Sequence, residues 1–157
     1  MGIGGKTVNN QSRQISRQDR RIIIVSVNQT DAKTILDKVL SIDTRVWAVS
    51  VIESNGKILA AKSTPSFKEM FGVIQDGEKY GGSLAAAMLG LVNELKGFFG
   101  EAQTIITVYN NCKLMLLNIS SHNILIGLAL ERSFNCEDDD FMEKIKQLIV
   151  AEANTKQ

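Results

Sequence analysis

The stretch Val46–Lys62, with the sequence VWAVSVIESNGKILAAK, contains two apolar runs separated by a short polar segment. The first run is rich in β-branched residues, and Asn55 and Gly56 close the polar segment. An Asn-Gly pair between two such runs is a strong hairpin signal, because both residues tolerate the positive φ of a type I′ turn. We therefore predict two antiparallel strands at Val46–Ile52 and Lys57–Lys62, joined by a type I′ turn.

The residues before this hairpin have the spacing of an amphipathic helix. Thr30 and Asp31 are good N-cap residues, and apolar residues then recur at helical spacing. These are Ile35, Leu36, Val39 and Leu40. We predict a helix over about Asp31–Ser41. The apolar run Ile22–Val27 fits either an extra strand or an extended lead-in to the domain.

Residues 63–80 are too long for a simple connection and contain the signals of a short helix. Thr64 can cap it, Pro65 suits the first helical position, and Gly72 can end it. On such a helix Phe67, Met70 and Phe71 would lie close together. This apolar group is interpreted as a lid over the core, or alternatively as a contact patch or small-ligand cover.

A long apolar helix is predicted from Ser83 to Phe99, after Gly81 and Gly82, with Gly100 at its end. One stripe contains larger side chains and a second face is nearly smooth. The stripe consists of Leu84, Met88, Leu91, Leu95 and Phe98, widened by Val92 and Phe99, and the smooth face of Ala85, Ala86, Ala87 and Gly90. A small domain can cover one face of such a helix with its sheet. The other face is therefore expected to meet a second subunit.

Three further strands and a final helix complete the chain. The strands are predicted at Thr104–Tyr109, Lys113–Ile119 and Ile124–Leu130, and the short turns between them make an antiparallel meander. The last helix begins among Glu137–Asp140, whose charges favour a helix N-terminus, and frays after Ala153. The fold class is thus α/β (α+β) with a five-stranded antiparallel sheet.

Composition places the chain among globular proteins with one domain. The 157 residues are 44% hydrophobic and 22% charged, and the net charge of +1 gives no general attraction to nucleic acid. Residues 1–29 form a basic arm, predicted to be mobile, with residues 30–157 as the domain. Four arginines of this arm would share one helical face that could meet an anionic membrane or an acidic partner. They are Arg13, Arg17, Arg20 and Arg21.

Targeting and thiol signals point to the cytoplasm. Residues 1–21 lack the apolar core of a secretory signal, and no apolar run reaches the length of about 20 residues that spans a bilayer. Cys112 and Cys136 form no close-spaced pair, which favours free thiols in a reducing compartment. We expect a cytoplasmic protein without a transmembrane segment.

The residues that usually carry catalysis or metal binding are sparse. Gly2–Thr7 resembles only the end of a phosphate loop, and the required earlier glycine has no place in the chain. His122, the only histidine, is interpreted as a polar turn residue, since a Ser-His mechanism would need a third orienting group. Asp138–Asp140 is explained by helix capping. We therefore expect no enzyme activity, no cofactor, no metal site and no nucleic-acid partner.

The order of elements resembles that of the roadblock / dynein light chain family over about Thr30–Ala153. The local resemblance lies in Val46–Ile52, in Asn55–Ala60 and in Ser83–Met88, which looks like the start of the family's long helix. The helix and entry segment Ile35–Asp43 is also similar to archaeal members of this type. The basic arm and the Ser63–Tyr80 connection depart from the family pattern.

The resemblance implies a non-enzymatic homodimeric adaptor that pairs through its long helix and edge strand and serves as a platform for a Ras-like small GTPase. The corresponding interface residues are Ala87, Met88, Leu91, Glu94, Leu95, Phe98, Ile105, Thr107 and Tyr109. The alternative is a small-ligand-binding sensor domain of a PAS-like or profilin-like kind, suggested by Phe67, Met70 and Phe71.

Overall fold

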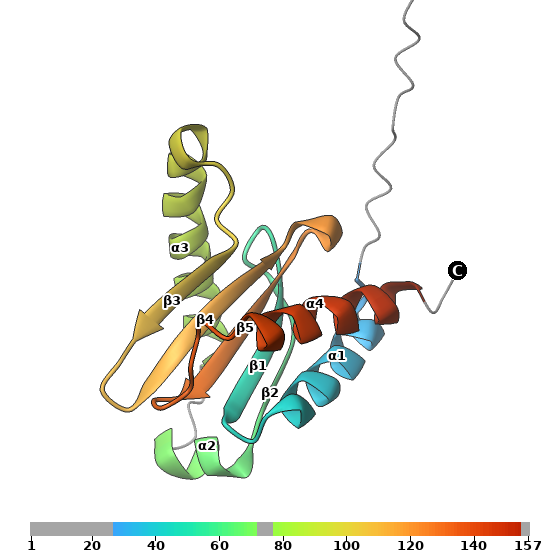
Figure 1. Cartoon of the computed structure of the whole chain (residues 1–157), viewed down its shortest axis with the longest axis vertical. Helices are drawn as coiled ribbons and strands as arrows, with labels where there is room; N and C mark the ends of the chain where they lie inside the picture. Colours follow the sequence, from blue (N-terminus) through green and yellow to red (C-terminus); the bar gives the residue numbers. More distant parts are fainter. Residues whose placement is uncertain (1–26, 72–76, 155–157) are drawn as a thin grey trace, which may run out of the picture.

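A computed structural model of the chain describes residues 27–71 and 77–154 (Figure 1). The elements in chain order are α1 (Gln29–Ile42), β1 (Val46–Glu53), β2 (Ile58–Ser63), α2 (Pro65–Phe71), α3 (Gly77–Phe99), β3 (Thr104–Val108), β4 (Cys112–Ile119), the 3₁₀ turn η1 (Ser120–His122), β5 (Ile124–Glu131) and α4 (Asp139–Asn154). This order confirms the predicted one. The predicted division at residue 29 stays a prediction, because residues 1–26 lie outside the described residues, as does most of the segment Ile22–Val27.

The five strands form one antiparallel sheet in the order β2-β1-β5-β4-β3. β5 lies at its centre, where Gly127 pairs with Ser50 of β1 and Leu116 of β4. Helices α1 and α4 cover one face, and α3 lies on the other (Figure 1). The predicted hairpin and meander are thus joined through the β1–β5 pair into a single sheet.

The main core lies between the sheet and the two helices α1 and α4. The strands β1, β4 and β5 contribute their inward residues, and the helices contribute residues at the predicted helical spacing. The fully buried side chains include Ile35, Val39, Met115, Leu117, Ile126, Leu130, Phe134, Ile145 and Ile149. An ion pair between Lys38 and Glu152 also joins α1 to α4. This face of the sheet is therefore closed within one chain.

The predicted hairpin is confirmed, but its turn is not type I′. The N–H of Gly56 donates to the carbonyl of Glu53, and the N–H of Glu53 donates to the carbonyl of Lys57. Ser54, Asn55 and Gly56 thus form a three-residue loop in which only Gly56 has positive φ, at 89°. The Asn55 side chain instead accepts from the N–H of Lys57, which holds the loop in the arrangement usual for three-residue hairpins.

Two helix starts differ from the sequence prediction. α1 begins earlier because Asn28, and not Thr30 or Asp31, caps it: the Asn28 Oδ1 atom accepts from the N–H groups of both those residues at 2.9 Å. α3 begins at Gly77, so it includes the Gly81–Gly82 pair, which the sequence prediction places before its start. Glycine weakens a helix by about 1 kcal/mol without forbidding it.

The remaining predicted elements agree with the structure to within a residue or two. Pro65 opens α2, and the Thr64 hydroxyl accepts from the N–H of Phe67 at 3.4 Å as a cap. Asp138 caps α4 by accepting from the N–H of Phe141 at 3.2 Å. The acidic segment therefore performs the structural role predicted for it.

Candidate interaction surface

The sheet-facing side of α3 makes a small apolar contact. Ala85 is buried against Ile52 of β1 and Leu125 of β5, and the half-buried Leu89 packs beside them. Ile58 and Leu116 complete this cluster. Among the described side chains of α3, only those near Ala85 are well covered by the sheet. The sheet therefore covers a smaller part of α3 than of α1 and α4.

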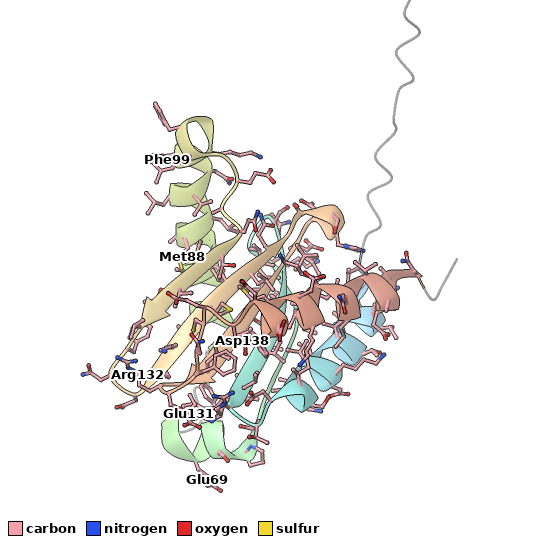
Figure 2. All side chains as sticks on the ribbon, viewed as in Figure 1. Glu69, Met88, Phe99, Glu131, Arg132 and Asp138 are labelled. Atoms are coloured by element: carbon pink, nitrogen blue, oxygen red, sulfur yellow. The ribbon has the colours of Figure 1, made fainter. Side chains whose placement is uncertain are left out.

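The outward side of α3 exposes large apolar side chains to solvent. Leu91 is 61% exposed, Leu95 43% and Phe98 84%. With Met88 they follow the alternating spacing of three and four residues that brings side chains onto one seam of a paired helix. Phe99, at 83%, lies at the end of α3, which extends past the strands (Figure 2).

The edge strand β3, which lies next to α3, also exposes large apolar side chains. Ile106 is 40% exposed, Val108 54% and Tyr109 45%. Of the exposed large hydrophobic residues in the described part of the chain, all but Val150 belong to α3 or to β3 and its following turn. Exposed apolar side chains that gather in this way mark an interaction site more often than scattered ones do.

The predicted interface residues differ in how far they are exposed to solvent. Ala87, Leu91, Glu94, Leu95, Phe98 and Tyr109 are exposed, whereas Met88, Ile105 and Thr107 are half-buried. Ile105 faces α3, because its β4 partner Leu116 packs in the α3 cluster. The prediction missed Ile106 and Val108, which lie on the opposite face of β3. Their alternation with Ile105 and Thr107 was the signal available in the sequence.

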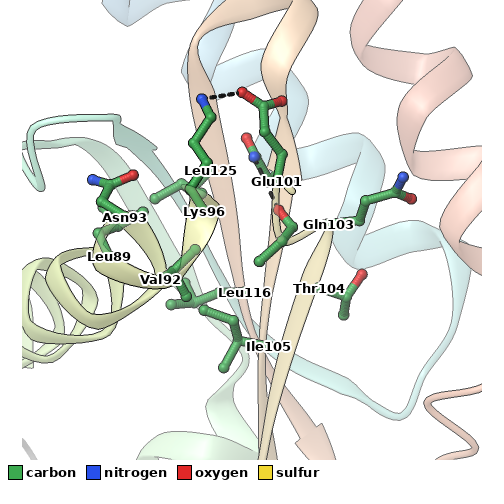
Figure 3. A pocket seen from close by; sticks show the side chains of 12 residues that line it. Leu89, Val92, Asn93, Lys96, Glu101, Gln103, Thr104, Ile105, Leu116 and Leu125 are labelled. Atoms are coloured by element: carbon green, nitrogen blue, oxygen red, sulfur yellow. Dashed lines mark hydrogen bonds and ion pairs between the residues drawn. The ribbon is translucent and has the colours of Figure 1, made fainter. Parts of the chain in front are cut away.

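A shallow cavity of about 60 Å³ lies between α3 and the strands β3 and β4 (Figure 3). Its apolar wall includes Leu89, Val92 and Leu116, and an ion pair between Lys96 and Glu101 lies at its rim. Ligand sites usually measure about 300–1,000 Å³. This cavity is too small for such a ligand, so it gives no support to the sensor alternative.

The predicted apolar patch on the 63–80 connection is only partly described. Phe67 is half-buried on α2, which contacts β1. The side chains of Met70 and Phe71 lie outside the described residues. Their interpretation as a lid, contact patch or ligand cover therefore stays a prediction.

His122 lies in η1, the predicted turn between two strands, but it is buried there, at 7% exposed. The Ser121 hydroxyl lies 2.8 Å from its Nδ1 atom, which is a Ser-His contact between chain neighbours. Among the described residues no third side chain is hydrogen-bonded to His122 to orient it as a catalytic base. The contact therefore satisfies a buried ring nitrogen, which fits a structural role.

Burial lowers the pKa of His122 below its usual value of 6.5. The unfolded chain consequently binds the proton more readily, so this residue's stability contribution is complete above pH 6.5 and falls as the pH drops below it. We expect His122→Gln to reduce the loss of thermal stability between pH 7 and pH 5. Ser121→Ala, which keeps the buried ring, should retain that loss in melting curves across this range. If the thermal stability of wild type and of His122→Gln fell equally with pH, His122 would not be the group responsible.

The cysteines and acidic residues show no arrangement for metal chemistry. Cys112 and Cys136 are buried free thiols, and burial raises the pKa of both. Within residues 27–71 and 77–154 no cluster of three or more His, Cys, Asp or Glu side chains could hold a metal ion. The helices of these same ranges are also too short or too polar to cross a membrane.

The fold of the chain is that of roadblock domains. The Roadblock/LC7 domain from Streptomyces avermitilis superimposes with a TM-score of 0.54 and 9% identity, over 75% of this chain and 91% of that one. Gliding protein MglB from Thermus thermophilus gives 0.58 at 12% identity, over 80% and 90%. A structure described as MglB with tetrameric arrangement gives 0.57 at 13%, over 80% and 87%. By sequence alone no protein family matches, and neither does any curated protein.

Proposed function

We propose, from the roadblock fold and the exposed surface of α3, that this protein is a non-enzymatic homodimeric adaptor that regulates a Ras-like small GTPase in the cytoplasm. The observation that carries the dimer is the exposed apolar side of α3, where Leu91 is 61% and Phe98 84% exposed, together with the exposed apolar side chains of the neighbouring edge strand β3. Burying one such side chain contributes about 1.5–3 kcal/mol. A second copy supplies the same apolar surface, so each chain covers the other.

The shape of α3 suits the close approach of a second helix. A Cβ atom added at Gly90 or Gly97 would meet nothing within 4 Å, so both positions open onto free space. Glycine inside a helix costs about 1 kcal/mol relative to alanine, and its absent side chain allows another backbone to come near. The spacing of seven residues places both glycines on one side of α3, next to the smooth face and not on the seam of larger side chains.

The regulatory role rests on the fold. The roadblock resemblance implies a platform for a Ras-like GTPase, and one structural neighbour is described in a tetrameric arrangement, which supports self-association in this fold. Chemistry by the adaptor itself is not needed for this role. The basic residues of the predicted arm, residues 1–29, offer an additional contact for an acidic partner.

Nucleotide-dependent capture tests the proposed role. The immobilised full chain is exposed to lysate from cells that make it, loaded with either GDP or a non-hydrolysable GTP analogue, and retained proteins are identified. We expect one small GTPase to be retained preferentially in one nucleotide state. The double variant Leu91→Glu/Leu95→Glu serves as control and should retain at least about tenfold less if the dimer forms the platform. Retention of no small GTPase in either state would contradict the regulatory role.

A further inference from the structure

The last turn of α3 carries two exposed aromatic side chains past the end of the sheet (Figure 2). Phe98 is 84% exposed and Phe99 83%, and their ring centroids lie 6.5 Å apart. A Cβ atom added at the flanking Gly97 or Gly100 would meet nothing within 4 Å. These two rings, which form the aromatic tip of α3, are thus almost fully open to solvent.

The chain around the aromatic tip is held by contacts within one protomer. The N–H of Gly100 donates to the carbonyl of Lys96 at 2.9 Å, and the positive φ of Gly100, 81°, ends the helix. The Lys96 ammonium group pairs with the carboxylate of Glu101, so these two charges cancel beside the tip. The next charge along the helix is Glu94, about 6 Å behind Phe98. The tip is therefore a fixed apolar projection with little charge of its own.

Charge is divided unevenly between the basic arm, residues 1–29, and the domain. The arm contains five of the chain's 18 lysines and arginines but only one of its 17 acidic residues, Asp19. It therefore has a net charge of +4, and residues 30–157, with 13 basic and 16 acidic residues, have −3. An anionic surface repels such a domain and attracts the arm. Within the arm, Arg20 and Arg21 directly precede the apolar run Ile22–Val25, a combination typical of segments that bind membrane surfaces.

The arm joins the domain toward the end of the sheet where the aromatic tip lies. Val27, the first described residue, is buried in the core just before α1. α1 ends close to the start of β1, and its 14 residues extend about 21 Å back along that strand toward its end. There Glu53 of β1 pairs with Ile124 of β5, and the nearby Asn118 side chain of β4 donates to the carbonyl of Ala102, just after α3, at 3.1 Å. Figure 1 shows the start of α1 and the end of α3 toward this same end.

We infer that the aromatic tip and the basic arm together attach this protein to the surface of a bilayer that contains anionic lipids. The rings of Phe98 and Phe99 enter the interface between headgroups and acyl chains, and the arginines of the arm contact lipid phosphates. Stable attachment takes two such signals, because a single one gives only marginal, reversible binding. Anionic lipids face the cytoplasm, so this attachment goes beyond the proposed function and is compatible with it.

A bilayer is favoured over an acidic protein as the partner because it accounts for both features at once. An acidic protein surface would attract the arm, but its charged groups offer no apolar cover for Phe98 and Phe99. A bilayer presents anionic headgroups directly above an apolar interior. Because the arm and the tip lie toward the same end of the domain, both can contact one such surface together.

Cosedimentation of the full chain with lipid vesicles tests the inference. We expect wild type to bind vesicles of phosphatidylcholine and phosphatidylserine at least about tenfold more tightly than vesicles of phosphatidylcholine alone, and to be released by added salt. Phe98→Ser/Phe99→Ser should weaken binding to the anionic vesicles at least about tenfold. The matched control is Val108→Ser, which should bind as wild type does. Val108 is 54% exposed and ends β3, at the far end of that strand from the tip.

Each other outcome overturns a defined part of the inference. Equal binding of wild type to the two kinds of vesicle, or no binding to either, overturns the attachment. Full retention of anionic binding by Phe98→Ser/Phe99→Ser means that the arm acts alone, as it would with an acidic protein, and overturns the role of the tip. If light scattering shows this variant to be a monomer where wild type is a dimer, the rings belong to the contact with a second copy and not to a membrane. The proposed homodimer and its regulatory role are tested separately and do not depend on vesicle binding.

Phe99→Trp provides a direct readout of insertion. Tryptophan emission moves to shorter wavelength when the indole ring leaves water for an apolar environment, and this ring suits a membrane interface. We expect that shift when phosphatidylserine-containing vesicles are added to Phe99→Trp, but not when they are added to Val108→Trp. Wild type, with Trp47 alone, gives the background emission. Unshifted emission from vesicle-bound Phe99→Trp would overturn insertion of the tip.

Discussion

We expect that replacing Leu91 and Leu95 with glutamate converts the proposed dimer to a folded monomer. Both side chains lie on the outward side of α3, 61% and 43% exposed, so the substitutions remove nothing from the core of one chain. In the proposed dimer each leucine is buried twice, once per protomer, and each glutamate adds an unpaired charge. We expect a loss of at least about 4 kcal/mol, which is near a thousandfold rise in the dimer dissociation constant.

The matched control for this variant is Val150→Glu. Val150 is 42% exposed, almost the same as Leu95, but lies on α4 on the opposite side of the sheet. Size-exclusion chromatography with light scattering should show a monomer for the α3 variant and a dimer for Val150→Glu, with equal far-ultraviolet circular dichroism. Equal dissociation of both variants would mean that α3 has no special part in association.

Phe134→Ala is expected to cause the largest loss of stability of any single substitution considered for this fold. Phe134 is 1% exposed, and its ring makes an edge contact with Phe141 of α4 at 4.7 Å between centroids. The Arg45 guanidinium lies 4.8 Å from the same ring and is held there by Asp43. Removing a buried phenylalanine costs about 3–5 kcal/mol, which for a domain of this size lowers Tm by about 10 °C.

The stability loss of Phe134→Ala is best measured in the Leu91→Glu/Leu95→Glu variant, which we expect to be monomeric, because dimerisation would otherwise add to the apparent stability. Urea unfolding followed by circular dichroism gives the free energy of unfolding. Phe98→Ala is the control: its side chain is 84% exposed, so the monomer should lose less than about 0.5 kcal/mol. A cost at Phe134 as small as that at Phe98 would contradict its place in the core.

The sequence predicted the fold well wherever local pattern and chain order were sufficient. The hairpin, the meander and the acid-capped α4 follow from turn residues and apolar spacing that act over a few positions. The predicted ends of helices and turns were less accurate where a neighbouring residue can act as the cap or turn residue instead. Asn28 displaced Thr30 and Asp31 as the α1 cap, and a three-residue loop displaced the type I′ turn at Asn55–Gly56.

The interaction surface was harder to predict because exposure depends on tertiary placement. The sequence marks α3 as apolar on most sides, but it does not say which side the sheet covers. Ala85 and Leu89 face the sheet, and the larger stripe containing Leu91 and Phe98 faces outward. Ile106 and Val108 were missed for the same reason: α4 covers their face of the sheet further in and contacts Thr104 at the start of β3, but it leaves Ile106 and Val108 exposed. The turn position of His122 could be predicted, but its burial could not, because burial depends on packing that a turn sequence does not encode.

The most direct test of the central claim is the mass of the full wild-type chain in solution. Sedimentation equilibrium over a concentration series from about 1 to 100 µM should fit a dimer of twice the chain mass of 17.3 kDa. A single species of 17.3 kDa at every concentration would contradict the claim that the exposed surface of α3 and β3 pairs with a second copy of the chain.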